Sequence, residues 1–329
     1  MEERLATVVM NAGSHYLLSE LPVWAPFPAV LRGKVRLQKS AATNPVAVGD
    51  LVKYTPSESP VIITEILPRR NYVIRKSTNL SRQAHIIAAN LDQAVIAVSL
   101  FFPEIKLPFL DRILVTCEVY KIPVVIVLNK VDLYREDAPE AVEAFHRIYG
   151  GAGYRVIETS CKTGEGIAEL REACSGKLSL ISGESGVGKS SLIKAVDPSL
   201  DPKIGKISLA HLQGKHTTSL YAMYPISSNT SSFRGAAPKV PRDPHAPAGY
   251  IIDSPGLRGF GLVDLEKEEI AKYFPEMLRS SDGCRFTPCT HTHEPGCAVK
   301  AAVESGEISA ERYNSYLGML EEDGKFRKG

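Results

Sequence analysis

A glycine-rich segment near the middle of the chain has the spacing of a phosphate-binding loop. Residues 183–190 read G-x-x-x-x-G-K-S, between a predicted strand at 177–182 and a predicted helix at 190–196. Glycines let backbone N–H groups close around phosphate oxygens, and a helix N-terminus adds positive potential. The lysine of this motif reaches the β- and γ-phosphates, and its hydroxyl ligates Mg²⁺. We therefore expect a nucleotide-phosphate site at Gly183, Glu184, Ser185, Gly186, Val187, Gly188, Lys189, Ser190 and Ser191.

A second motif selects the base of that nucleotide. Asn129, Lys130 and Asp132 form an N-K-x-D sequence at the end of the apolar run 122–128. The Asp132 carboxylate can accept two hydrogen bonds, from N1–H and from the exocyclic amine of guanine. Adenine presents an acceptor where guanine has N1–H, so it would leave a buried polar group unpaired. The motif therefore predicts GTP rather than ATP as the ligand.

Two further segments resemble guanine-nucleotide contacts of GTPases. Ser160, Cys161 and Lys162 follow the next predicted strand and resemble the second guanine-contacting loop, whose backbone N–H binds the base oxygen. Asp253 and Gly256 belong to D-S-P-G, which resembles the D-x-x-G element. In that element the Asp supports Mg²⁺ through water and the Gly N–H meets the γ-phosphate.

The segment between the phosphate loop and D-x-x-G holds a candidate switch. A switch threonine is expected there to complete the Mg²⁺ shell, and either Thr217 or Thr218 could serve. Leu257 occupies the position where many GTPases have a glutamine that orients water. His216 is the nearest polar candidate in sequence for that catalytic role, although it could also be an ordinary polar loop residue.

The order of these motifs differs from that of an ordinary GTPase. The usual order begins with the phosphate loop and ends with N-K-x-D and the second guanine loop. Here N-K-x-D and the segment 160–162 come first, and the phosphate loop follows. The sequence therefore predicts a circularly permuted GTPase domain, in which the switches run directly into the C-terminal region.

A cluster of cysteine and histidine in the C-terminal region has metal-ligand spacing. Three thiolates and one imidazole saturate tetrahedral Zn²⁺ and leave no open position for catalysis. A single structural Zn²⁺ is therefore expected, with His293 as an alternative to the histidine of the set. The expected ligands are Cys284, Cys289, His291 and Cys297.

Three domains are expected to carry these motifs. Residues 1–75 hold short alternating runs, near 7–10, 31–37, 50–54 and 61–67, that suit an all-β OB-fold barrel. Residues 76–264 alternate buried strands and helices, which indicates an α/β sheet around the permuted P-loop GTPase site. Residues 265–329 are expected to form a helical zinc-binding domain, with helices at 265–278 and 309–322. A long loop is expected over 225–249.

Composition excludes several classes of protein. Of 329 residues, 44% are hydrophobic and 23% charged, which is ordinary for globular domains with buried cores. The apolar runs are far shorter than the roughly 18 residues that indicate a membrane span. The first residues lack the basic and apolar regions of a secretory signal. These features favour a cytoplasmic protein with no membrane partner.

Bulk charge does not indicate a nucleic-acid partner, so any basic surface must be local. Lys+Arg total 39 against 37 Asp+Glu. Arg32, Lys34 and Arg36 alternate along one predicted strand, and residues 68–82 carry Arg69, Arg70, Arg75, Lys76 and Arg82 without an acid. This basic stripe on the barrel could bind RNA phosphates, or it could be a solvated strand face.

The motifs together resemble the RsgA family (YjeQ/YloQ), circularly permuted GTPases that assist late maturation of the small ribosomal subunit. The most specific matches are the phosphate loop, H-T-T at 216–218, D-S-P-G at 253–256 and H-T-H-E-P-G-C at 291–297. The resemblance implies that the chain binds GTP and GDP, hydrolyses GTP slowly alone and faster on the small subunit, and contacts its rRNA. It further implies one Zn²⁺, Mg²⁺ bound with GTP, and a monomer.

Two competing functions remain. A nucleotide-gated rRNA-binding protein with little intrinsic hydrolysis is favoured by Leu257, which cannot hydrogen-bond water. A plain P-loop ATPase is disfavoured by Asn129 and Asp132.

Overall fold

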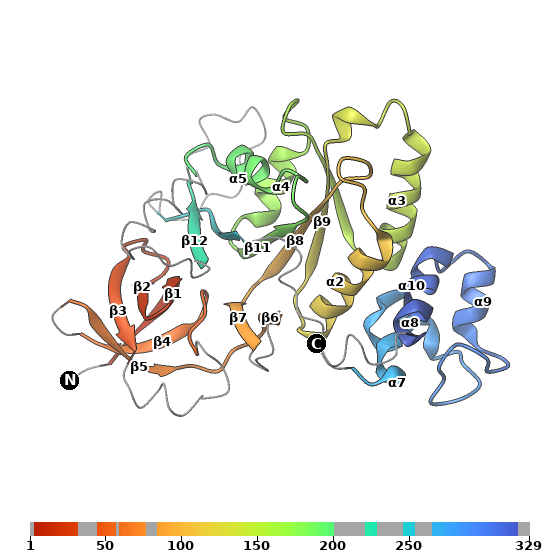
Figure 1. Ribbon diagram of the computed structural model, residues 1–329, viewed down its shortest axis with the longest axis horizontal. Coiled ribbons are helices and arrows are strands. Elements are labelled where there is room, and N and C mark those ends of the chain that lie inside the picture. Colours follow the sequence, from red (N-terminus) through yellow and green to blue (C-terminus); the bar gives the residue numbers. More distant parts are fainter. Residues whose placement is uncertain are drawn as a thin grey trace.

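The computed structural model contains a β-barrel, a central sheet flanked by helices, and a small helical region (Figure 1). The structure describes residues 3–31, 45–56, 59–76, 84–200, 221–228, 246–253 and 265–321. Among these residues, no helix is both long enough and apolar enough to cross a membrane.

The N-terminal strands close into a five-stranded barrel. Neighbouring strands follow the order β1-β2-β3-β5-β4, and β4 pairs back with β1. The strands are β1 (Arg4–Ala12), β2 (His15–Ser19), β3 (Phe27–Leu31), β4 (Leu51–Thr55) and β5 (Val61–Ile66). Alternate side chains, among them Val8, Leu18 and Ile63, fill its interior. The expected all-β barrel is therefore confirmed. The strand expected over 31–37 is described only at Leu31, the last residue of β3.

The central sheet has five parallel strands and one antiparallel edge strand, in the order β10-β9-β8-β11-β13-β12. Its strands are β8 (Gln93–Val98), β9 (Val124–Asn129), β10 (Arg155–Thr159), β11 (Leu178–Gly183), β12 (Tyr221–Ile226) and β13 (Gly249–Asp253). The helices beside it are α2 (Leu107–Val119), α3 (Pro139–Ala152), α4 (Ile167–Cys174) and α5 (Lys189–Val196).

Helices cover both faces of this sheet (Figure 1). Ala94, Ile96 and Val98 of β8 pack in one core with α2 and α3, whereas Val95 and Ala97 pack in the other with α4 and α5. Strands buried on both faces read as continuous apolar runs, which is why the sequence indicated parallel strands here. The expected α/β domain with a permuted order is confirmed, because the strand before N-K-x-D precedes the phosphate-loop strand.

The barrel and the central sheet are joined by hydrogen-bonded strands. The end of β1 pairs with the start of β12, with Met10 opposite Ala222 and Asn11 opposite Tyr221. A two-stranded hairpin, β6 (Tyr72–Lys76) and β7 (Ala84–Ala89), lies between the barrel and β8. The loop expected over 225–249 starts later, because Pro225 and Ile226 extend β12. Proline is tolerated there because β1 pairs with β12 only at Tyr221 and Ala222.

The C-terminal region is helical, as expected. Its elements are α7 (Lys267–Ile270), a 3₁₀ turn (Ala271–Tyr273), α8 (Pro275–Ser281), α9 (Ala298–Glu304) and α10 (Ala310–Glu321). The prediction of a single helix over 265–278 is wrong, because the helical conformation is interrupted at Phe274, just before Pro275. A residue that precedes proline is pushed from the helical to the extended conformation, and Phe274 has φ −107° and ψ 101°.

A buried arginine joins this region to the central α/β domain. Arg312 of α10 is fully buried and donates to Asp111 on α2 at 2.7 Å. It also donates to both carboxylate oxygens of Glu276 on α8, at 2.7 and 3.2 Å. The Phe274 ring lies 4.6 Å from its guanidinium carbon. Burial raises the pKa of Asp111, and the positive charge of Arg312 opposes that rise.

Two arginines of the expected basic stretch form ion pairs within the protein. Arg69 donates to both oxygens of the buried Asp50, at 2.6 and 2.7 Å. Arg70 pairs with Asp92 at 2.7 Å, but its side chain is 59% exposed. Arg69 is therefore engaged near the barrel, whereas Arg70 stays at the surface. Arg32, Lys34 and Arg36 lie outside the described residues.

Candidate nucleotide and metal sites

The phosphate loop lies between β11 and α5, as its motif requires. Gly188 has φ +101°, and a Cβ there would come within 2.6 Å of Nδ2 of Asn129. Gly183 is equally restricted, because a Cβ would lie 2.5 Å from the carbonyl oxygen of Ala97. Glycine at these positions allows the loop to pass close to the neighbouring strands.

The cationic and hydroxyl groups of the loop sit at its helical end. Nζ of Lys189 donates to the carbonyl oxygens of Gly183 at 2.5 Å and Glu184 at 2.8 Å, so the ammonium lies over the loop. Ser190 is exposed in the first turn of α5. Both groups are thus placed beside the N-terminus of a helix, where phosphate oxygens are favoured.

Two side chains of N-K-x-D connect the base motif to the phosphate loop. The buried Asn129 donates from Nδ2 to the carbonyl of Val187 at 2.8 Å and accepts from the hydroxyl of Thr159 at 2.9 Å. Lys130 donates to the carbonyls of Gly186 at 2.7 Å and Phe102 at 2.5 Å. The N-K-x-D segment, which comes first in the permuted order, therefore contacts the phosphate loop, which comes later.

The two expected guanine-contacting loops face each other. Asp132 is exposed in the 3₁₀ turn Val131–Leu133 that follows β9. Burial raises the pKa of the Cys161 thiol, and the nearby Asp132 carboxylate raises it further. The Ser160 hydroxyl accepts from the N–H groups of Lys162 at 3.2 Å and Thr163 at 3.1 Å. That hydroxyl therefore holds the turn of the second loop.

The structure describes only some of the residues that are expected to lie near Mg²⁺. Asp253 is buried at the end of β13, paired in register with Ile181 of the phosphate-loop strand. Asp253 therefore reaches the same edge of the sheet as Ser190. Gly256, His216, Thr217 and Thr218 lie outside the described residues.

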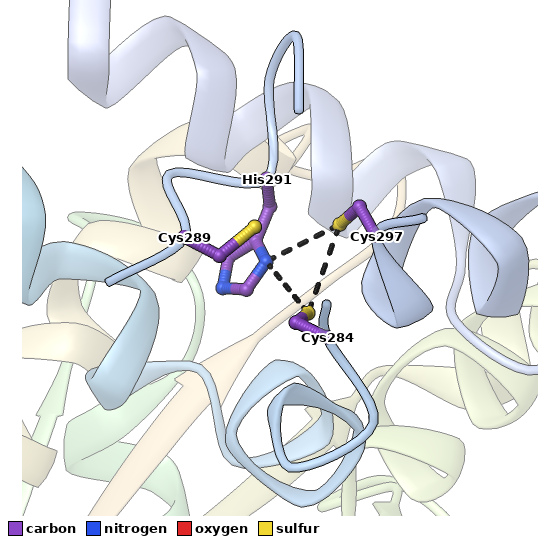
Figure 2. Close-up of side chains that lie close together, drawn as sticks. All are labelled: Cys284, Cys289, His291 and Cys297. Atoms are coloured by element: carbon purple, nitrogen blue, oxygen red, sulfur yellow. Dashed lines mark hydrogen bonds between the residues drawn. The ribbon is translucent and has the colours of Figure 1, made fainter. Parts of the chain in front are cut away.

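Cys284, Cys289, His291 and Cys297 converge on one point (Figure 2). Their ligand atoms all lie within 4.8 Å of one another. Sγ of Cys284 lies 3.9 Å from Sγ of Cys297, and Nδ1 of His291 lies 3.4 Å from Sγ of Cys297. Tetrahedral Zn²⁺ with ordinary bond lengths would need about 3.8 Å and about 3.5 Å for these two separations. The cluster could hold a metal ion. His293 is exposed and outside it.

The protonation states of the cluster also suit a cation. Burial and the neighbouring Cys297 thiol raise the pKa of Cys289 to about 12. A bound cation would favour the thiolate form of Cys289. Burial lowers the pKa of His291, which keeps the imidazole neutral and able to bind metal.

Hydrogen bonds from side chains outside the Cys-Cys-His-Cys set fix the backbone of the loop that carries His291. Tyr313 and Tyr316 of α10 donate to the carbonyls of His291 at 2.6 Å and Thr290 at 2.5 Å. Oε1 of Glu294 accepts from the N–H of Thr290 at 2.7 Å, and its Oε2 accepts from the N–H of Thr292 at 3.0 Å. The tyrosines bind carbonyls 22 and 26 residues away in sequence, so no local pattern could have identified them.

Comparison with known proteins gives the family. A sequence model of the RsgA GTPase family matches residues 66–232. The small ribosomal subunit biogenesis GTPase RsgA of Bacteroides fragilis is 46% identical over 323 residues, which are 97% of this chain and 98% of that protein. The chain belongs to the RsgA GTPase family.

Other RsgA proteins and two solved structures extend the likeness over nearly the whole chain. The RsgA of Porphyromonas gingivalis is 41% identical over 319 residues, 96% of each chain. The crystal structure of YjeQ from Thermotoga maritima is 33% identical with a TM-score of 0.75, covering 97% of this chain and 98% of that one. YloQ, a circularly permuted GTPase, is 24% identical with a TM-score of 0.69, covering 97% of this chain and 94% of that one, and shows the shared fold. The resemblance to RsgA seen in the sequence is thus confirmed.

Proposed function

We propose that this RsgA-family protein hydrolyses GTP while bound to the small ribosomal subunit and assists late maturation of that subunit. The observation that carries the nucleotide part is the position of Asn129. Its amide joins the phosphate loop to the end of β10, so the groups that read the base and the phosphates form one site. The relatives named as small ribosomal subunit biogenesis GTPases support the ribosomal part.

Within this proposal each residue of the site has a task. Asp132 and the backbone at 160–162 read guanine, and Lys189 with the loop at 183–191 binds the phosphates. Ser190 and the buried Asp253 offer the oxygen ligands that Mg²⁺ prefers, with Thr217 or Thr218 as a further ligand. When bound, Mg²⁺ neutralises charge on the phosphates. Gly256 offers its N–H to the γ-phosphate. The domains are proposed to span 1–75, 76–264 and 265–329.

The proposal includes rRNA contacts, a monomer and a cytoplasmic location. It is tested by sedimentation of the full chain with purified small subunits at several salt concentrations. The form bound to a non-hydrolysable GTP analogue should sediment with the subunit at least about tenfold more tightly than the GDP form. Equal and weak binding of the GTP, GDP and nucleotide-free forms would contradict a GTP-dependent role on the subunit.

We propose that the metal is one structural Zn²⁺ per chain. Changing Cys289 to Ser should lower the zinc content from about one to below about 0.2 per chain, because a thiolate ligand is lost from a four-ligand set. Metal analysis of purified protein measures this. His293→Ala is the matched control, since this exposed neighbour should leave zinc unchanged. Full zinc content in Cys289→Ser would overturn the ligand set, and loss of zinc in His293→Ala would make His293 a ligand.

His216 is proposed to orient the attacking water in place of a glutamine. A neutral imidazole can hydrogen-bond water, whereas the side chain of Leu257 cannot. His216→Ala should reduce subunit-stimulated GTP turnover about 100-fold while GTP affinity stays within a few-fold. His211→Ala, in the same segment, is the control and should behave as wild type. Stimulated turnover near the wild-type rate in His216→Ala would point to a ribosomal group supplied in trans.

A nucleotide-gated rRNA-binding protein with little hydrolysis remains the second candidate. Leu257 favours it, since this residue provides no hydrogen bond for water.

A further inference from the structure

A charged cluster lies on the outer side of the two guanine-reading loops. Arg135 follows N-K-x-D, Glu158 is the last residue but one of β10, and Glu165 lies within the second loop. Nη1 of Arg135 donates to Oε1 of Glu165 at 2.6 Å, and Nη2 donates to Oε2 of Glu158. Nε2 of His146 on α3 lies 2.7 Å from the other oxygen of Glu158. One guanidinium thus spans both loops.

Backbone hydrogen bonds connect this charged cluster to the residues that are expected to contact the base. The N–H of Arg135 donates to the carbonyl of Val131 at 3.0 Å, directly beside Asp132. The carbonyl of Glu165 accepts from the N–H of Ser160 at 3.1 Å. A movement of either charged side chain would therefore be transmitted to a residue expected to contact guanine.

Arg135, Glu158, Glu165 and His146 line a hollow of about 670 Å³ together with apolar side chains, among them Val142 and Val156. Within this hollow the ion pairs of Arg135 connect the segment after N-K-x-D to the second loop, in addition to the strand pairing of Asn129 with Thr159. A guanidinium suits this place, because its planar fork binds two carboxylates in a fixed geometry.

We infer that Arg135 is a positioning residue for guanine recognition, which sets the spacing between Asp132 and the backbone of Ser160, Cys161 and Lys162. The base must contact both loops at once, so its affinity depends on this spacing. This inference rests on the proposed guanine-nucleotide site. Arg135 itself touches neither base nor phosphate.

The test measures binding of a fluorescent GDP to the full chain. Arg135→Gln should weaken GDP affinity about three- to tenfold, mainly through faster dissociation, as expected for two half-exposed ion pairs. Glu165→Gln should act in the same direction. The double variant should be no weaker than Arg135→Gln alone, because the two residues act through one contact. Arg135→Lys should fall between wild type and Arg135→Gln.

Two comparisons separate positioning from a general effect on folding. Arg155→Gln is the matched control, because Arg155 pairs with Glu169 at 3.0 Å on β10 and α4 without joining the loops. It should leave GDP affinity within about twofold. Competition by inorganic tripolyphosphate, which has no base, should be equal for wild type and Arg135→Gln. The melting temperature of the nucleotide-free variant should stay within about 2 °C.

The outcomes distinguish this inference from the proposed function. GDP affinity of Arg135→Gln within twofold of wild type, effects of Arg135→Gln and Glu165→Gln that simply add, or an equal loss for tripolyphosphate would overturn the positioning role. Wild-type protein that binds ADP as tightly as GDP would instead overturn the guanine site, and the inference with it.

Discussion

Replacing Asp132 by Asn is expected to weaken GTP binding by at least about 100-fold, because one of two hydrogen bonds to a charged acceptor, each worth about 1.5–3 kcal/mol, is lost and the other is left with a neutral acceptor. The asparagine amide keeps one acceptor and adds a donor, so it faces the exocyclic amine of guanine with the wrong group. Xanthine has a carbonyl in place of that amine. The variant should therefore bind xanthosine triphosphate more tightly than GTP.

Competition between GTP and xanthosine triphosphate for the protein measures this change in base preference. Asp137→Asn is the matched control, because Asp137 is an exposed acid five residues further along the same segment. It should keep the wild-type preference for GTP. An Asp132→Asn protein that still prefers GTP would remove Asp132 from the base site.

Replacing Arg312 by Met is expected to lower the free energy of unfolding by about 3–5 kcal/mol, since it leaves the carboxylates of Asp111 and Glu276 buried without their partner. Urea unfolding of the C-terminal region measures this loss. The loss should be smaller at pH 5 than at pH 8. A buried carboxyl with a raised pKa is neutral in acid, and its cost to folding grows as the pH rises through the folded pKa.

Arg279→Met is the control at the same interface. Arg279 of α8 donates to the carbonyls of Ala152 at 3.2 Å and Gly151 at 3.1 Å on α3, but it is partly exposed. Its loss should cost less than about 1 kcal/mol. Equal costs for the two arginines would mean that Arg312 is not the connection between the domains.

The parts of the fold predicted from sequence are those with local patterns. The phosphate loop depends on glycines within eight residues, and parallel strands buried on both faces leave continuous apolar runs. The Cys-Cys-His-Cys spacing likewise lies in a short segment, and its side chains do converge. For the same reason the runs predicted over 122–128 and 177–182 end within one residue of β9 and β11, which end at Asn129 and Gly183.

The contacts missed from sequence join segments far apart in the chain. Arg312 meets Asp111 across 201 positions, and β1 pairs with β12 across more than 200. The pairing of Arg69 with the buried Asp50 is another such contact, which a local count of basic residues over 68–82 does not reveal. The helix break at Phe274 did have a local signal in Pro275, which the apolar periodicity of the segment concealed.

The most direct test of the central claim is GTP turnover by the wild-type chain, measured as phosphate release with and without purified small ribosomal subunits. The proposed function predicts slow turnover of GTP by the free protein, at least about tenfold faster turnover with the subunit, and none of ATP in either condition. GTP turnover that the subunit leaves unchanged, while GTP-dependent binding to it persists, would contradict a subunit-stimulated GTPase. That result would establish the nucleotide-gated rRNA-binding protein in its place.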